Sequence, residues 1–276
     1  MRVIINADDL GISSIINQAI EKCIINGEIT STSVMAGAKA FAEGIEIVKK
    51  YPQISVGVHL TIDEEMSLTK SPIFLKYGIM DYNGHFIKSA ISKVPKFTNE
   101  LKEAIYAEWD MQINAVKNTG IIVSHVDSHH HYHTIPELKN VLFCLMRENG
   151  VKRIRLCSNK MFKMYIHRKE IKKTLFPSTG IVNQRIKQKK IMLWLPIFIN
   201  IFKIYRWNRS AKKKFFTADY FCSYAFYIIN KDFFVKYYPK VTIELMCHPG
   251  NTNYEQETIR LKELPFDVKK INYNDL

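Results

Sequence analysis

Residues 120–133 read Gly-Ile-Ile-Val-Ser-His-Val-Asp-Ser-His-His-His-Tyr-His. The apolar residues at the start predict the end of a buried strand, from Gly120 to His125. The last ten residues hold five of the nine histidines of the chain, together with Asp127. Imidazole is the commonest protein ligand of metals near neutral pH, and a neighbouring carboxylate can ligate or orient it. The stretch therefore predicts a metal site. The alternative is a solvated histidine-rich loop, which is less favoured because such loops seldom concentrate histidine in this way.

The same pattern of an apolar run followed by polar residues recurs along the chain. Residues 2–7 are almost wholly apolar and lead into Asp8 and Asp9. Further strands are expected at 30–35, 54–60, 153–156 and 241–247, and helices at 14–26, 40–51, 99–118 and 138–149. Strands alternate with helices, and polar residues collect where the strands end. In (β/α) barrels and open α/β sheets, active sites are built at that end.

Length and composition indicate one large α/β domain over residues 1–276. The five cysteines show no paired spacing, and the first residues carry no signal segment, so a reducing, cytoplasmic setting is expected. The net charge of +14 would attract polyanions, nucleic acid or an anionic membrane surface. Much of the basic excess lies between Lys152 and Lys214, which points to one region of the chain.

That region reads as a basic and apolar insertion at about residues 160–216. Basic residues at 185–190 precede an apolar run at 191–202, and further basic residues follow up to Lys214. The apolar run is shorter than the roughly 20 residues of a membrane-spanning helix. A peripheral membrane contact through 185–214 is one interpretation. A lid or dimer helix with its basic flanks in water is the other, and we favour it.

Four predicted strand ends offer side chains that suit metal-assisted hydrolysis: Asp8 with Asp9, His59, the histidines from His125 to His133, and His248. One carboxylate and two imidazoles can hold a divalent ion and leave open positions for water. One of the paired aspartates would then be a ligand, and the other could accept a proton from water. His248 suits a general acid. Taken singly, the paired aspartates could be a helix cap and His59 a core residue. Their recurrence at strand ends favours a shared site.

Five motifs along the chain resemble the successive motifs of the YdjC-like family, which includes chitooligosaccharide deacetylases. They are Asn6-Ala7-Asp8-Asp9-Leu10-Gly11, Thr30-Ser31-Thr32-Ser33, Gly57-Val58-His59-Leu60, His125-Val126-Asp127-Ser128-His129-His130-His131 and His248-Pro249-Gly250. The resemblance implies a (β/α) barrel-like fold, a distorted TIM-type barrel with its active site at the C-terminal ends of the strands. It also implies a divalent metal, Mg²⁺ or Zn²⁺ with Mn²⁺ or Co²⁺ as alternatives, and a homodimer.

The resemblance further suggests residue roles. Asp9, His59 and His129 would bind the metal, Asp8 would be the catalytic base and His248 the acid. Roles within the histidine cluster are less specific. His125 could ligate in place of His129 or beside it. Asp127, His131 or His133 could orient a ligand or touch the sugar.

Arg155 is also assigned to the substrate, although residues 156–159 depart from the family pattern there. The insertion is unusual for a soluble chitobiose enzyme. It could accept a lipid-linked or polyanionic sugar.

The sequence therefore predicts a divalent-metal-dependent hydrolase that removes an N-acetyl group from an amino sugar or oligosaccharide. A metal-dependent phosphoesterase is the alternative enzyme, because clusters of histidine and aspartate at strand ends also serve phosphoryl chemistry. The non-enzymatic alternative is a protein that binds an acidic polymer, which the net charge of +14 would favour. Nucleic acid is not an expected partner, because the chain lacks basic motifs interleaved with aromatic residues.

Overall fold

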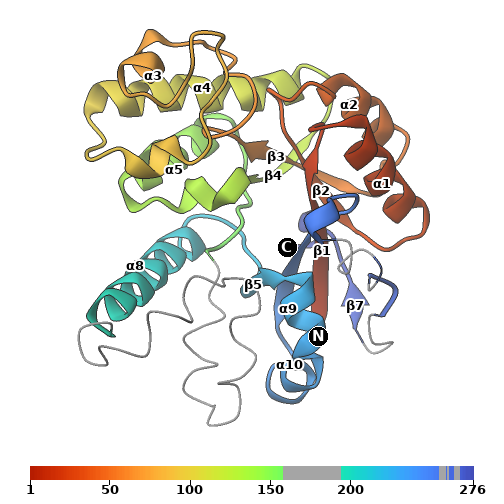
Figure 1. Ribbon diagram of the computed structural model, residues 1–276. Coiled ribbons are helices and arrows are strands. Elements are labelled where there is room, and N and C mark those ends of the chain that lie inside the picture. The colour runs from red at the N-terminus through yellow and green to blue at the C-terminus, as the bar shows by residue number, and fades with distance from the viewer. Residues whose placement is uncertain (158–193, 255–258, 260, 264–267) are drawn as a thin grey trace.

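The computed structural model describes residues 1–157, 194–254, 259, 261–263 and 268–276 (Figure 1). Its centre is a parallel sheet in the order β4-β3-β2-β1-β6-β5, with β7 paired to β1. The strands are β1 (Arg2–Leu10), β2 (Ser31–Val34), β3 (Ser55–Leu60), β4 (Val123–Ser128), β5 (Tyr220–Ser223), β6 (Thr242–Cys247) and β7 (Lys269–Lys270). All residues of β2 and β3 are buried, as a parallel sheet covered on both faces requires.

Helices connect the strands and cover the sheet (Figure 1). They are α1 (Ser14–Ile25), α2 (Phe41–Lys49), α3 (Pro72–Lys76), α4 (Asn99–Lys117), α5 (Lys139–Glu148), α8 (Trp194–Lys212), α9 (Tyr224–Ile229) and α10 (Lys231–Tyr237). Short 3-10 turns are η1 (Ala90–Lys93), η2 (His129–Thr134), η3 (Pro136–Leu138), η5 (Thr252–Tyr254), η6 (Leu261–Glu263) and η7 (Tyr273–Asp275). Side chains of Ser13 and Thr98 accept hydrogen bonds from Ile16 N and Leu101 N and so cap α1 and α4. The helices predicted from the apolar spacing are confirmed.

The sheet curls beyond β4. Val126 N donates to Arg153 O (3.1 Å), and Arg155 N donates to Val126 O (3.1 Å). Ile154 N in turn donates to Phe216 O (3.1 Å), and Phe216 lies four residues before β5 at the other edge. The predicted α/β fold is therefore confirmed as a curled, half-barrel parallel sheet. A closed eight-stranded TIM barrel is not found within the described part of the chain.

The C-terminal segment packs at the start of β3, where Tyr273 N donates to Ser55 Oγ (3.1 Å). The Tyr273 ring stacks on His125, with ring centroids 3.6 Å apart and planes 7° apart. On its other side His125 lies against Gly57, where an added Cβ would come within 2.3 Å of the imidazole. Figure 1 shows the C-terminus beside the central strands. His125 is thus packed from several elements as a core residue.

Most of the predicted insertion lies outside the described residues, including the basic cluster at 185–190 and the start of the apolar run. From Trp194 the chain forms α8, and Trp207 and Ala211 of this helix are buried. Asn208 accepts from Cys157 N (2.9 Å) and donates to Cys157 O (3.2 Å), which fixes α8 to the segment after Arg155. Among the helices described, none has the length and apolarity to cross a bilayer.

Candidate metal and catalytic site

Strand β1 runs on through both aspartates to Leu10, so Asp8 and Asp9 lie within it. Neighbouring strand residues normally point to opposite faces. Here the register with β2 shifts between Ala7 and Leu10, and Asp9 has a left-handed backbone with φ of 70°. Such an irregularity re-aims a side chain. Both carboxylates consequently approach His59, with Nε2 lying 3.3 Å from Asp9 Oδ1 and 4.0 Å from Asp8 Oδ2.

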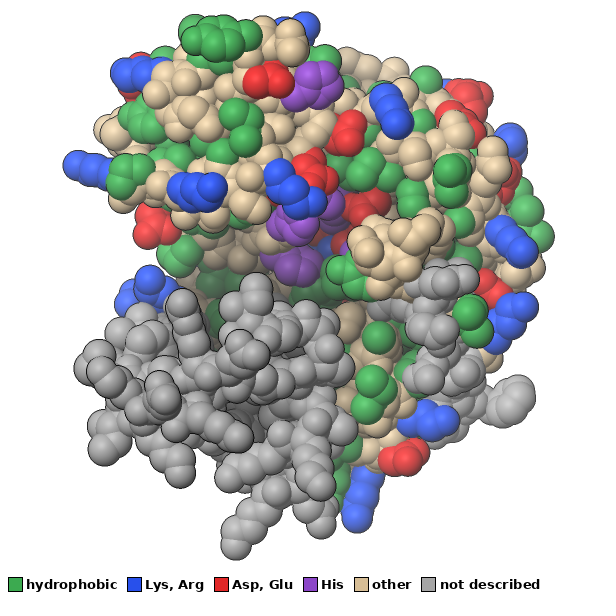
Figure 2. Space-filling view, in the orientation of Figure 1, with side chains coloured by type: hydrophobic (Ala, Val, Ile, Leu, Met, Phe, Trp, Pro, Cys, Tyr) green, Lys and Arg blue, Asp and Glu red, His purple; other side chains and the backbone are tan. Residues whose placement is uncertain are grey.

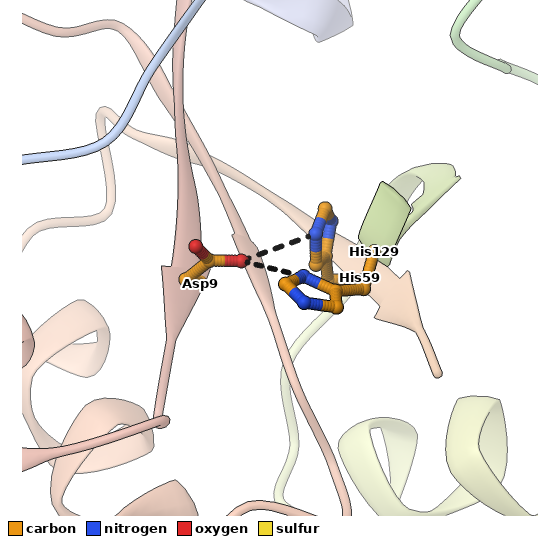
Figure 3. A group of neighbouring side chains, drawn as sticks. All are labelled: Asp9, His59 and His129. Carbon is orange, nitrogen blue, oxygen red and sulfur yellow. Dashed lines mark hydrogen bonds and ion pairs between the residues drawn. The ribbon is translucent and has the colours of Figure 1, made fainter. Parts of the chain in front are cut away.

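Three predicted metal ligands converge at the ends of β1, β3 and β4 (Figure 3). His59 Nε2 lies 3.3 Å and His129 Nδ1 lies 3.2 Å from the same oxygen, Asp9 Oδ1. His59 is the penultimate residue of β3, and His129 is the first residue after β4. One carboxylate oxygen and two imidazole nitrogens form a donor set that fits a divalent cation with open positions.

Charge interactions within this group oppose the effect of burial. Burial alone would raise the pKa of Asp9, but hydrogen bonds with His129 and His59 hold it well below its usual range. Burial would lower the pKa of His59, whereas Asp127 and Asp8 raise it well above its usual range. The site thus keeps an ionised carboxylate and attracts positive charge, as a cation-binding site requires.

Asp127 contacts the ring nitrogen of His59 that faces away from Asp9. Asp127 Oδ1 lies 2.8 Å from His59 Nδ1, and Asp127 Oδ2 accepts from Ser33 Oγ (3.0 Å). A proton held on Nδ1 by Asp127 would leave Nε2, on the Asp9 side of the ring, as the nitrogen that binds a cation. The side chain of Asp127 is fully buried. This geometry favours a ligand-orienting role for Asp127 over the sugar contact proposed for it from the sequence.

Arg155 is also fully buried and is enclosed by three carboxylates. Nη1 and Nη2 donate to the two oxygens of Asp8 at 2.6 and 2.7 Å. Nη1 also lies 2.8 Å from Asp127 Oδ2, and Nε donates to Glu244 Oε1 at 2.6 Å. The sequence suggested a substrate contact for Arg155. The structure instead places its guanidinium as a bidentate clamp on Asp8.

His125, the other metal ligand considered, joins no group of metal-ligating side chains in the described parts of the chain. Its Nδ1 bonds to Ser124 Oγ (2.8 Å), and its ring packs between Tyr273 and Gly57. His129, not His125, lies beside Asp9 and His59.

The remaining candidates lie around this centre. His131 has a left-handed backbone (φ 60°), and its ring lies 5.3 Å from that of Phe221. Its Nδ1 is buried and has no hydrogen-bond partner among the described residues. His248 directly follows β6, stacks on Tyr254 with centroids 4.4 Å apart, and is near enough to Asp9 to lower the pKa of that carboxyl. In Figure 2, histidine and acidic side chains meet near the centre of one face.

The model of the family described as YdjC-like protein matches residues 2–271. The chain belongs to the YdjC-like family. Three curated relatives are named carbohydrate deacetylase. They come from Vibrio parahaemolyticus (33% identical over 151 residues), Halalkalibacterium halodurans (33% over 145) and Clostridium beijerinckii (32% over 151). These matches cover 55%, 51% and 55% of this chain and 57%, 60% and 58% of the relatives. The chain thus spans little more than half the length of the curated relatives it matches.

A crystal structure from Enterococcus faecalis V583, of a candidate cellobiose-phosphate cleavage protein, has a fold similar to that of this chain. Its TM-score is 0.62 at 18% identity, and the match covers 99% of this chain and 98% of that one. At this identity the likeness supports the fold alone.

Several residues of this YdjC-like site were not singled out from the sequence. Glu244 stands between apolar residues in a buried strand, and that placement is a usable signal because a charge there needs a partner. Asn6 donates to Asp8 Oδ1 (2.8 Å) and to Ser33 Oγ (3.1 Å), yet nothing in its motif distinguishes it from a turn residue. Asp63 and Glu64, just after the His59 strand, contact the histidine cluster.

Two buried histidines of the YdjC-like chain predict acid sensitivity. Burial lowers the pKa of His125 and of His133 to about 3, against the raising effect of Asp127. An unfolded histidine titrates near pH 6.5. Between about pH 6.5 and 3 the unfolded chain binds more protons, so the free energy of unfolding should fall as the pH falls through this window. Above pH 6.5 the contribution is complete.

Urea unfolding at pH 7.5, 6 and 5 measures this slope. His125→Phe, which keeps a ring against Tyr273, should show a shallower slope than the wild type. Equal slopes in the two proteins would show that His125 does not carry the effect.

Proposed function

We propose that this protein is a divalent-metal-dependent hydrolase that removes an N-acetyl group from an amino sugar or oligosaccharide. The observation that carries the proposal is the position of Asp8. An arginine clamp holds its carboxylate 4.0 Å from His59, beside the donor set of Asp9, His59 and His129. The names of the curated relatives support a carbohydrate deacetylase.

Asp9, His59 and His129 would hold the cation. When bound, a divalent cation supplies Lewis acidity toward the acetyl carbonyl and lowers the pKa of water. The described residues would do the rest. Asp8 accepts the proton of the attacking water, and Arg155 keeps the carboxylate in place for that transfer. His248 donates a proton to the departing amine.

The sugar would lie over the histidines that follow β4. His131 is the candidate for a sugar contact because its Nδ1 has no described partner. The basic residues of α8 suit a lipid-linked or polyanionic sugar, since no acidic residue occurs from Trp194 to Ala218. The cytoplasmic location, the homodimer and a peripheral membrane contact remain predictions.

A metal-dependent phosphoesterase is the second candidate. It is favoured by a second group of metal-ligating side chains, Asp63, His129 and His130, next to the first. Two neighbouring ions are common in phosphoryl chemistry.

Acetate release from N-acetylated sugars, both soluble and lipid-linked, tests the proposal. Protein stripped with chelator should be inactive, and Mg²⁺, Zn²⁺, Mn²⁺ or Co²⁺ should restore activity. His59→Gln should lose activity together with the ion held by Asp9, His59 and His129. Phosphate release from a phosphoester without acetate release from any sugar would favour the second candidate. Activity that is unaffected by chelation would overturn metal dependence.

A further inference from the structure

The loop after β3 and the turn after β4 bring a second set of ligating atoms together. Ligand atoms of Asp63, His129 and His130 all lie within 4.8 Å of one another. Asp63 Oδ2 lies 2.5 Å from His130 Nδ1, and Glu64 Oε2 lies 3.1 Å from His129 Nε2. This group borders the Asp9 centre but adds two carboxylates and one imidazole that the proposed hydrolysis does not use.

The Asp63 carboxylate has one oxygen whose hydrogen-bonding capacity no described residue satisfies. Its side chain is fully buried, and Oδ1 has no hydrogen-bond partner in the described part of the chain. A buried carboxylate oxygen without a partner is costly and indicates a bound water or ion. The loop is fixed nearby, because Gln112 accepts from Thr61 N (2.8 Å) and donates to Thr61 O (3.0 Å). These two hydrogen bonds fix the backbone two residues before Asp63 and so restrict the position of its side chain.

The turn that carries the histidines has an unfavourable backbone. His130 and His131 have φ values of 48° and 60°, a region that residues other than glycine rarely adopt. Such conformations are strained and cluster at functional sites. In this turn the rings of His129 and His130 lie side by side, with centroids 4.0 Å apart.

We propose that Asp63 and His130, with Glu64 beside them, form a second divalent-cation site next to the first. His129 Nδ1 lies 3.2 Å from Asp9 and Nε2 lies 3.1 Å from Glu64, so with Nδ1 on the first ion its Nε2–H would donate to Glu64 and the second ion would not depend on His129. Mixed nitrogen and carboxylate ligands suit Zn²⁺, Mn²⁺ or Co²⁺. The His130 side chain is 42% exposed, which leaves positions on the ion open to solvent. A phosphate or carboxylate group of the substrate can occupy them, a role that rests on the proposed function, whereas ion binding does not.

Equilibrium dialysis of metal-free protein against Zn²⁺ tests the second site. The wild type should bind two ions per chain, and Asp63→Asn and His130→Gln should each bind one. His85→Gln changes an exposed histidine and should keep two. His59→Gln should keep one ion while losing the catalytic one. Circular dichroism checks that each variant is folded, and the exposed His130 provides a variant with little risk to folding.

One ion per wild-type chain, or two ions retained in both Asp63→Asn and His130→Gln, would overturn the second site. Loss of an ion in His85→Gln would assign the second equivalent to the surface and would also overturn it. The proposed function fails in a different way. A protein that binds two ions but releases no acetate contradicts the deacetylase, whereas one that binds a single ion and releases acetate contradicts only this inference.

Discussion

Replacing Asp8 with asparagine is expected to lower kcat for acetate release by about 10²–10⁴-fold, the usual contribution of a general base. The amide keeps the shape of the carboxylate and can still accept from Arg155, but it cannot take a proton from water. Asp8 lies outside the Asp9, His59 and His129 set, and its other group, with His59 and Asp127, is already paired with the Arg155 guanidinium, so the metal held by the first set should be unchanged. Steady-state kinetics and metal analysis on the same preparation measure both quantities.

Asp9→Asn is the matched control for this experiment. It changes the neighbouring carboxylate by the same single atom, and it should lose metal as well as activity. If Asp8→Asn keeps full turnover, Asp8 is not the base. If it loses metal to the same extent as Asp9→Asn, the two aspartates do not divide their roles as proposed.

Replacing Arg155 with methionine should destabilise the protein by about 3–5 kcal/mol, the usual cost of removing one partner from a buried ion pair. The change leaves Asp8, Asp127 and Glu244 buried around an apolar side chain. Burial already raises the pKa of Glu244 to about 7 despite Arg155, so this carboxylate should become neutral in the variant. Urea unfolding at pH 7.5 measures the loss.

Arg153→Met provides the comparison, because the Arg153 side chain donates to Asn274 O near the surface and faces no carboxylate in the contacts described. Its effect should be small. Equal stability of the two variants would rule out a structural role for the clamp. Arg155→Lys keeps the positive charge but cannot make the bidentate contact with Asp8. Its free energy of unfolding should therefore lie between those of Arg155→Met and the wild type. Its turnover should stay well below that of the wild type, because Asp8 is no longer held in place.

Much of the fold could be predicted because hydrophobic periodicity is a local property. The apolar runs at 2–7, 54–60 and 241–247 predict strands, and the structure has strands there. The convergence of Asp9, His59 and His129 follows from parallel strands ending together. The exact strand ends are harder to predict. The apolar pattern ends at residue 7 and at His125, whereas β1 continues to Leu10 and β4 to Ser128.

The rest depended on contacts between distant residues. The clamp joins Arg155 to Asp8, 147 positions away, and to Glu244, 89 positions away. No local pattern specifies such a meeting. That His125 would be core and His129 a site residue depends on the turn at 129–131 and on Tyr273, which arrives from the other end of the chain. The sharing of His59 by both aspartates depends on an irregularity in β1 that spacing does not reveal.

The Asp127 carboxylate touches both halves of the centre, His59 through one oxygen and Arg155 through the other. Whatever changes the charge on His59 therefore also changes the field in which Arg155 holds Asp8. The affinity for a cation and the rate of turnover at Asp8 are therefore expected to be coupled quantities. In a double-mutant cycle, substitutions at His59 and Arg155 should be non-additive, although the two side chains have no contact assigned between them. Evolution could adjust both quantities at once by changing the environment of this one carboxylate.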